Sequence, residues 1–215
     1  DNKPSWLFFE IAAQALGGMS LGIYRDTLDE EVGYLINAAK VNFAYAEDQE
    51  QVDKLLSIKR AKNNNITIFY EDSRGLKELN DPHIIDMLDL IKEGKAVTAK
   101  NPNKYNQLID KISSDQNAIL CTTSGTTSNP KLAMLPGGKF IEHVVRYLNV
   151  DPKTIDDEYV SVLPFPWIME QTYAVGFNIV GGMKVNFPER PDTAMEDMRE
   201  IGPTFMLGAP RLWEQ

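Results

Sequence analysis

Apolar runs with two different periods follow one another along the chain. Apolar side chains recur at helical spacing from Leu28 to Ala39, and Asp26 and Thr27 just before them could cap the first turn. Shorter runs rich in β-branched and aromatic residues predict strands, most clearly at 66–70 (ITIFY). The chain is therefore expected to alternate helices with strands.

Applied to the whole chain, the same two periods give a set of expected elements. The expected helices are 4–16, 28–39, 49–62, 82–94, 102–114, 140–148, 167–180 and 192–201. The expected strands are 19–24, 42–46, 66–70, 119–121, 160–165, 183–187 and 204–207. This alternation predicts an α/β fold with one or more mostly parallel sheets and helices packed on their faces.

Glycine and proline mark several expected boundaries. Gly17-Gly18 and Gly181-Gly182 are expected to end helices. In the helix expected over 82–94, the inner side should carry the apolar residues Ile84, Ile85, Leu88 and Ile91. The segment 101–103 (NPN) is the best linker candidate, although it is too short to establish a domain boundary.

Composition and charge narrow the class of protein. A hydrophobic content of 43% and a charged content of 25% are typical of a globular chain. The net charge of -9 disfavours a nucleic-acid partner, which needs a basic face. The apolar stretch 6–24 is as long as a membrane span but contains Glu10 and Gln14, so it is better explained as a helix followed by a strand. The single Cys121 fits a reducing compartment and is expected to be a small buried hydrophobe.

Candidate chemistry is concentrated where the expected strand 119–121 ends. Hydroxyl and glycine residues fill the seven positions 122–128, and Asn129, Pro130 and Lys131 follow. Small donors and backbone N–H groups suit a phosphate group, and Lys131 would add a mobile positive charge. By composition alone, such a segment is more often a solvated turn. The rival phosphate loop G-x-x-x-x-G-K-[ST] does not occur.

Order and spacing favour the functional interpretation. The segment 123–131 (TSGTTSNPK) resembles the signature loop of the adenylate-forming superfamily of acyl-CoA synthetases, adenylation domains and luciferases, usually Thr-Ser-Gly-Thr-Thr-Gly-x-Pro-Lys-Gly. Ser128 and Leu132 stand where that family usually has glycine. The segment 163–167 (LPFPW), followed by Glu170, resembles a second superfamily motif. The segment 203–214 is similar to one typical of long-chain acyl-CoA synthetases, so the resemblance runs almost end to end.

The resemblance implies a reaction and a set of site residues. Relatives use ATP to convert a carboxylic acid to an acyl-adenylate, which the thiol of coenzyme A then captures. It implies that Lys131 is the catalytic cation and that the Thr123 hydroxyl lies nearest Mg²⁺. The residues implied to grip the β- and γ-phosphates are Ser124, Gly125, Thr126, Thr127 and Lys131. Trp167 stands where many relatives carry histidine. It is expected either to line an acyl or adenine-side pocket or to be a core aromatic.

The expected protein is a long-chain fatty acid:CoA ligase, of which residues 1–215 form part of the N-terminal AMP-binding domain. The family's later motifs, which supply a carboxylate for magnesium, an aspartate for the ribose and a mobile lysine, have no match here, so the chain alone is expected to be inactive. The expected partners are fatty acid, ATP and coenzyme A, in the cytoplasm, with peripheral membrane contact left open. The alternatives are a ligase for an aryl, short-chain or amino acid, and a phosphate-binding module without catalysis.

Overall fold

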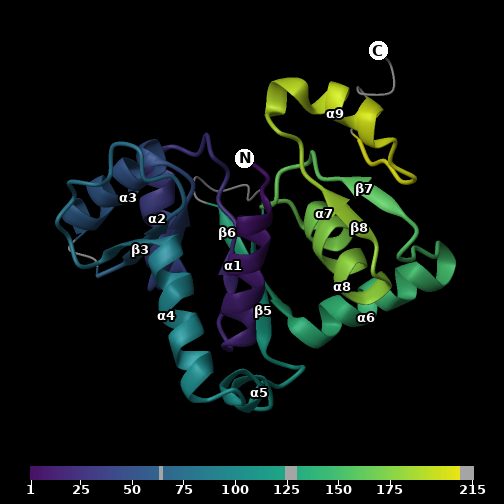
Figure 1. Cartoon of the computed structure of the whole chain (residues 1–215), viewed down its shortest axis with the longest axis horizontal. Coiled ribbons are helices and arrows are strands. Elements are labelled where there is room, and N and C mark those ends of the chain that lie inside the picture. The colour runs from purple at the N-terminus through teal and green to yellow at the C-terminus, as the bar shows by residue number, and fades with distance from the viewer. Residues whose placement is uncertain (63–64, 124–129, 209–215) are drawn as a thin grey trace. The chain divides into compact units, whose positions relative to one another are not determined.

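The chain forms two compact units. The structure is a computed structural model that describes residues 1–62, 65–123 and 130–208 (Figure 1). The first unit combines Asp1–Tyr24 with Ser113–Gln215, and the second is Arg25–Ile112. Because the first unit is assembled from two separate stretches of chain, residues far apart in the sequence meet inside it.

The second unit contains a three-stranded parallel sheet in the order β2-β3-β4. Its strands are β2 (Phe43–Ala46), β3 (Thr67–Tyr70) and β4 (Ile84–Asp86). Its helices are α2 (Asp29–Ala38), α3 (Gln49–Lys62), α4 (Met87–Lys100) and α5 (Lys104–Ile109). Ile66 and Ile68 of the central strand region have no exposed surface. Helix α2 buries its apolar stripe of Val32, Leu35 and Ile36, as the sequence predicts.

Three local expectations in this unit are wrong: the side-chain cap of the helix over 28–39, the start of the helix over 82–94, and the buried inner side of that helix. Helix α2 has Leu28 at its N-cap position and no side-chain cap, although three acidic residues in its first turn favour the helix dipole. The expected helix over 82–94 begins only at Met87, because Ile84–Asp86 pairs with β3 as a strand. Asp86 then caps α4 by accepting a hydrogen bond from the Leu88 N–H at 2.8 Å. None of the residues of α4 is buried, so the expected inner side does not form.

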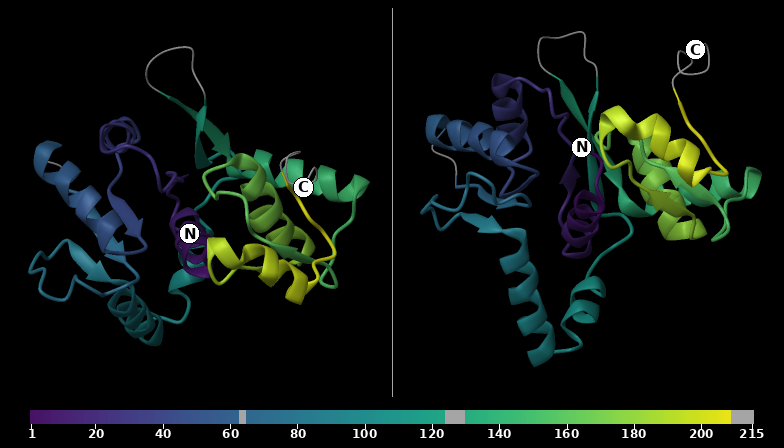
Figure 2. Two further views of the ribbon diagram at one scale, coloured as in Figure 1. Left: turned by 90° about the horizontal axis from the view of Figure 1, so that it is seen from above. Right: turned by 45° about the horizontal axis from the view of Figure 1, so that its top comes forward.

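The first unit contains a sheet in the order β1-β5-β6, in which β1 is parallel and β6 antiparallel to β5. The strands are β1 (Ser20–Leu21), β5 (Asn117–Thr123) and β6 (Lys131–Pro136). Figure 2 shows β5 and β6 running side by side. The sequence did not indicate β6. A separate parallel pair joins β7 (Glu158–Val160) to β8 (Lys184–Asn186).

The helices of the first unit are α1 (Pro4–Ala15), α6 (Gly137–Val150), α7 (Ile168–Glu170), η1 (Gln171–Gly176), α8 (Phe177–Gly181), η2 (Pro191–Thr193) and α9 (Ala194–Ile201). All of these except η2 and α9 contribute residues to an aromatic core or pack against it. The core includes Phe165, Tyr173 and Phe177, and the rings of the last two meet edge to face at 5.0 Å. The expected apolar helix over 167–180 is confirmed as the run α7–η1–α8, whose middle part is π-helical.

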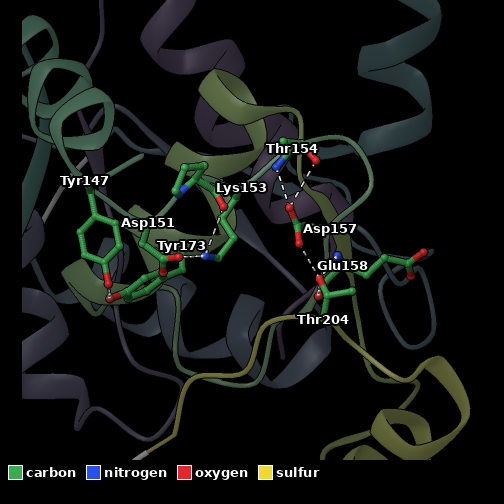
Figure 3. Close-up of polar contacts among 9 residues, drawn as sticks. Tyr147, Asp151, Lys153, Thr154, Asp157, Glu158, Tyr173 and Thr204 are labelled. Atoms are coloured by element: carbon green, nitrogen blue, oxygen red, sulfur yellow. Dashed lines mark hydrogen bonds and ion pairs between the residues drawn. The ribbon is translucent and has the colours of Figure 1, made fainter. Parts of the chain in front are cut away.

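The connection from α6 to β7 is fixed by a polar cluster (Figure 3). Asp157 accepts hydrogen bonds from the Thr154 N–H at 2.8 Å and the Thr204 hydroxyl at 2.9 Å. The Glu158 N–H donates to the same hydroxyl at 2.9 Å. These bonds hold the segment around Thr204 beside β7, where the expected strand 204–207 is reduced to one bridge between Tyr159 and Phe205.

The strand expected over 160–165 ends at Val160. Pro164 and Pro166 lack the N–H that a ladder requires, and 161–167 instead makes an irregular connection to α7. Phe165 is buried nevertheless, and its ring stacks on that of Trp6 with centroids 4.4 Å apart. This connection thus packs against α1.

Candidate functional site

The β5–β6 hairpin brings two of the predicted site residues together. Thr123, the last residue of β5, pairs with Lys131, the first residue of β6. The Thr123 hydroxyl donates to the Lys131 carbonyl at 3.4 Å. Both residues are exposed, and within residues 1–62, 65–123 and 130–208 no ion pair involves Lys131. The Thr123 hydroxyl and the Lys131 ammonium, which has no ion-pair partner among the described residues, therefore flank the segment 124–130.

The remaining predicted phosphate ligands lie outside the described residues. They are Ser124, Gly125, Thr126 and Thr127. Their role stays a prediction.

Trp167 stands at the N-terminal end of α7. Its backbone N–H donates to the Pro164 carbonyl at 2.9 Å, and its own carbonyl accepts from the Glu170 N–H at 3.0 Å. The residue is 41% exposed. A large ring is therefore available at the surface of the described chain, at the end of the second motif, and its role stays a prediction.

Glu170 of the second motif is completely buried. It accepts hydrogen bonds from the Tyr159 hydroxyl at 2.6 Å and from the Ser161 hydroxyl. Burial raises the pKa of Glu170 to about 7, against the opposing effect of these two hydrogen bonds. The sequence placed Glu170 in a motif but gave no sign that it would be enclosed.

A second buried carboxylate, Glu10 of α1, was not predicted as a site residue. It is 4% exposed and accepts hydrogen bonds from Ser20 at 2.6 Å, Gln14 at 3.3 Å and Gln171 at 3.2 Å. Burial raises its pKa to about 7 as well. The available signal was a glutamate and a glutamine four residues apart in an otherwise apolar helix, which places both on one face.

Cys121 is a free, buried thiol in β5 whose pKa is raised by burial. The prediction that it is a small buried hydrophobe is therefore confirmed.

Among the residues that the structure describes, the expected Mg²⁺ position at Thr123 has no cluster of metal ligands around it. Within the described part of the chain, no group of three or more His, Cys, Asp and Glu residues could hold a metal ion. The Thr123 hydroxyl could offer Mg²⁺ one oxygen, and a hard cation needs several.

Membrane insertion by a helix has no support in the described elements. In residues 1–62, 65–123 and 130–208, every helix is too short or too polar to cross a bilayer. The apolar stretch near the N-terminus instead forms α1 and β1, as the sequence predicts.

The arrangement of elements defines the chain as an α/β domain of the kind found in CoA ligases. It superposes on the anthranilate CoA ligase AuaEII in complex with anthranoyl-AMP with a TM-score of 0.73 and 16% identity, covering 97% of this chain and 38% of that one. ATP-bound MatB from Rhodopseudomonas palustris gives a TM-score of 0.67 at 17% identity, covering 98% and 38%. At these identities the likeness shows the fold alone, and it confirms the predicted class.

The profile of the AMP-binding enzyme family matches residues 1–215, and the chain belongs to that family. It is similar to the long-chain-fatty-acid–CoA ligase ACSBG1 of Rattus norvegicus, with 30% identity over 224 residues that cover 100% of this chain and 30% of that protein. The ligase ACSBG2 of Homo sapiens is 28% identical over 219 residues, covering 100% and 32%. The chain thus spans about a third of the length of these curated relatives.

Proposed function

We propose that the chain is part of the N-terminal AMP-binding domain of an acyl-CoA synthetase that uses ATP to activate a long-chain fatty acid. Family membership supports the reaction class, and the curated relatives named above support the choice of acid. The observation that carries the proposal is the β5–β6 hairpin, which pairs Thr123 with Lys131 across the ends of the hydroxyl-rich segment.

In this proposal the chain's own residues act by holding charge in place. The fatty acid carboxylate attacks the α-phosphorus of ATP and pyrophosphate leaves, so no protein nucleophile is needed. Lys131 offsets negative charge on the leaving pyrophosphate, and the donors that hold the β- and γ-phosphates are Ser124, Gly125, Thr126 and Thr127. The thiol of the co-substrate coenzyme A then takes the acyl group from the acyl-adenylate, and AMP leaves.

The magnesium ion that accompanies ATP would be held only in part by this chain. Bound to the triphosphate, Mg²⁺ offsets charge on the leaving group. The exposed hydroxyl of Thr123 is the single ligand that we assign here, and phosphate oxygens and a carboxylate from the rest of the synthetase would supply the others. The 215-residue chain alone is therefore expected to release no pyrophosphate.

Trp167 is proposed to line the acyl or adenine side of the substrate site. Its exposed ring lies at the end of the second motif, where apolar area is available to a ligand. Replacing it by alanine should alter the preference among acid chain lengths if the ring lines the acyl side, and should raise KM for ATP if it lines the adenine side.

The test uses the full-length protein that contains this chain and measures pyrophosphate release and acyl-CoA formation with acids of increasing chain length. Lys131→Met should lower kcat/KM for ATP by roughly 100-fold, the size of effect seen when a transition-state donor is removed. Lys139→Met is the matched control, because Lys139 is exposed on α6 and pairs only with Glu142 at 3.0 Å among the described residues. It should change activity by less than about 2-fold.

The alternatives give different results in the same assay. Turnover with aryl, short-chain or amino acids but not with long-chain fatty acids would overturn the choice of acid while retaining adenylation. Binding of ATP without pyrophosphate release from any acid would indicate a non-catalytic phosphate-binding module.

A further inference from the structure

One carboxylate of the first unit connects the two segments that the proposed function assigns to the site. Glu10 lies in the middle of α1, and its two oxygens accept hydrogen bonds from different elements. Oε1 accepts from Ser20 of β1 at 2.6 Å, and Oε2 accepts from Gln171 of η1 at 3.2 Å. Ser20 and Gln171 are far apart in the sequence, so this carboxylate is a tertiary link.

The first connection leads to the strand that precedes the phosphate segment. Ser20 pairs in parallel with Ile119 of β5, and β5 ends at Thr123. The Ser20 hydroxyl also lies 3.3 Å from the Ala118 carbonyl and accepts a hydrogen bond from Gln14 at 3.1 Å. A change in the position of Ser20 would therefore be transmitted to β5.

The second connection leads to the second motif. The Gln171 side-chain amide donates both to Glu10 and to the Phe165 carbonyl, the latter at 2.9 Å. Close packing joins the same two regions. Gly22, just after β1, lies so near Pro166 that a Cβ added to it would come within 2.7 Å of the Pro166 Cα. The connection at 165–167 thus lies directly against the chain that follows β1.

Burying the polar groups of this link costs desolvation free energy. Glu10 and Gln171 are 4% and 2% exposed, and Gln171 Oε1 has no hydrogen-bond partner among the described residues. Two apolar side chains of similar size would avoid these desolvation costs. What they would not supply is a directional link whose geometry fixes three elements relative to one another.

We infer that Glu10 is a positioning residue of the adenylation site. It holds β5, and with it Thr123, in a fixed relation to the segment 165–171. The inference rests on the proposed function, since only adenylation makes both segments parts of one site.

The test is a double-mutant cycle in the full-length protein with Glu10→Leu, Gln171→Leu and the double variant. Each single variant should lower kcat for acyl-CoA formation by roughly 10-fold, the lower end of the range for residues that orient a site, with a smaller change in KM for ATP. The double variant should be no slower than the slower single variant, because both remove the same link. Hydrogen–deuterium exchange should show faster exchange in 117–123 and 165–171 in each variant.

Leu7→Ala is the matched control. Leu7 is buried on the same helix, at 6% exposure, and belongs to the aromatic core, so its loss destabilises α1 without touching the polar link. It should leave kcat within about 3-fold and should not raise exchange selectively in those two segments.

Additive effects of the two single variants, or an equal response to Leu7→Ala, would overturn the positioning role. An inactive wild-type protein would contradict the proposed function instead. The exchange measurements would then still decide whether Glu10 fixes the two segments.

Discussion

Replacement of Glu170 by glutamine should remove a specific pH dependence of stability. Glu170 is completely buried, and its pKa rises from 4.5 to about 7 because burial disfavours the charged form. At about 1.4 kcal/mol per pKa unit, that difference corresponds to about 3 kcal/mol. Protonation is favoured in the folded state, so this stability is fully present below about pH 4.5 and is lost as the pH rises through about 7.

The variant keeps the shape of Glu170 but cannot ionise. The unfolding free energy of Glu170→Gln minus that of the wild type should therefore rise by about 3 kcal/mol between about pH 4 and about pH 8. Urea unfolding followed by tryptophan fluorescence reports on the relevant unit, because Trp6 and Trp167 lie in the first unit and residues 25–112 contain no tryptophan. Glu10 titrates in both proteins and cancels in the difference.

The control is Glu142→Gln on the surface of α6. The pKa of Glu142 is lowered, chiefly by its hydrogen bond from Lys139 and by the charge of Arg146, so its pH dependence has the opposite sign. The difference in unfolding free energy between Glu170→Gln and the wild type is the quantity tested. If it stays constant with pH, or falls as the pH rises, Glu170 is not a buried carboxylate that ionises near neutrality.

Two further predictions concern packing. Gly22→Ala should destabilise the chain by about 1–3 kcal/mol, because the new methyl group would lie 2.7 Å from the Pro166 Cα. Gly94→Ala should stabilise it by about 0.5–1 kcal/mol, because Gly94 lies in the exposed helix α4 with no atom within 4 Å of the added methyl group. Equal urea midpoints for the two variants would contradict these opposite effects. Cys121, buried with a raised pKa, should react with a thiol reagent far more slowly in the folded chain than in urea. Equal rates would place it at the surface.

Local periodicity accounts for the elements that the sequence predicted well. The helix Gln49–Lys62 matches its expected bounds, because an apolar stripe and a polar face coincide there over 14 residues. The strand β6 was missed, because Lys131–Pro136 begins with a lysine, ends with a proline and follows a polar segment. At 82–94 the residues Ile84 and Ile85 fit either a strand or a helix, and only pairing with β3 decides between them.

The site was predictable only where its chemistry is contiguous in the chain. The order of residues in 123–131 was enough to predict a phosphate-binding segment, and this stays a prediction. The structure adds that Thr123 and Lys131 pair across the ladder between β5 and β6. The buried hydrogen bond between Glu10 and Gln171 joins residues 161 positions apart. No local sequence pattern predicts a contact over that distance in the chain. The same holds for the enclosure of Glu170, whose hydrogen-bond donors are Tyr159 of β7 and Ser161 just after it.

The decisive experiment is a structure of the full-length protein with ATP and Mg²⁺ bound. We expect the β- and γ-phosphates to lie within about 2.7–3.2 Å of the Lys131 Nζ and of the hydroxyl and amide groups of 124–127. A triphosphate bound elsewhere, with those hydroxyls turned toward the protein and occupied by neighbouring groups, would contradict it.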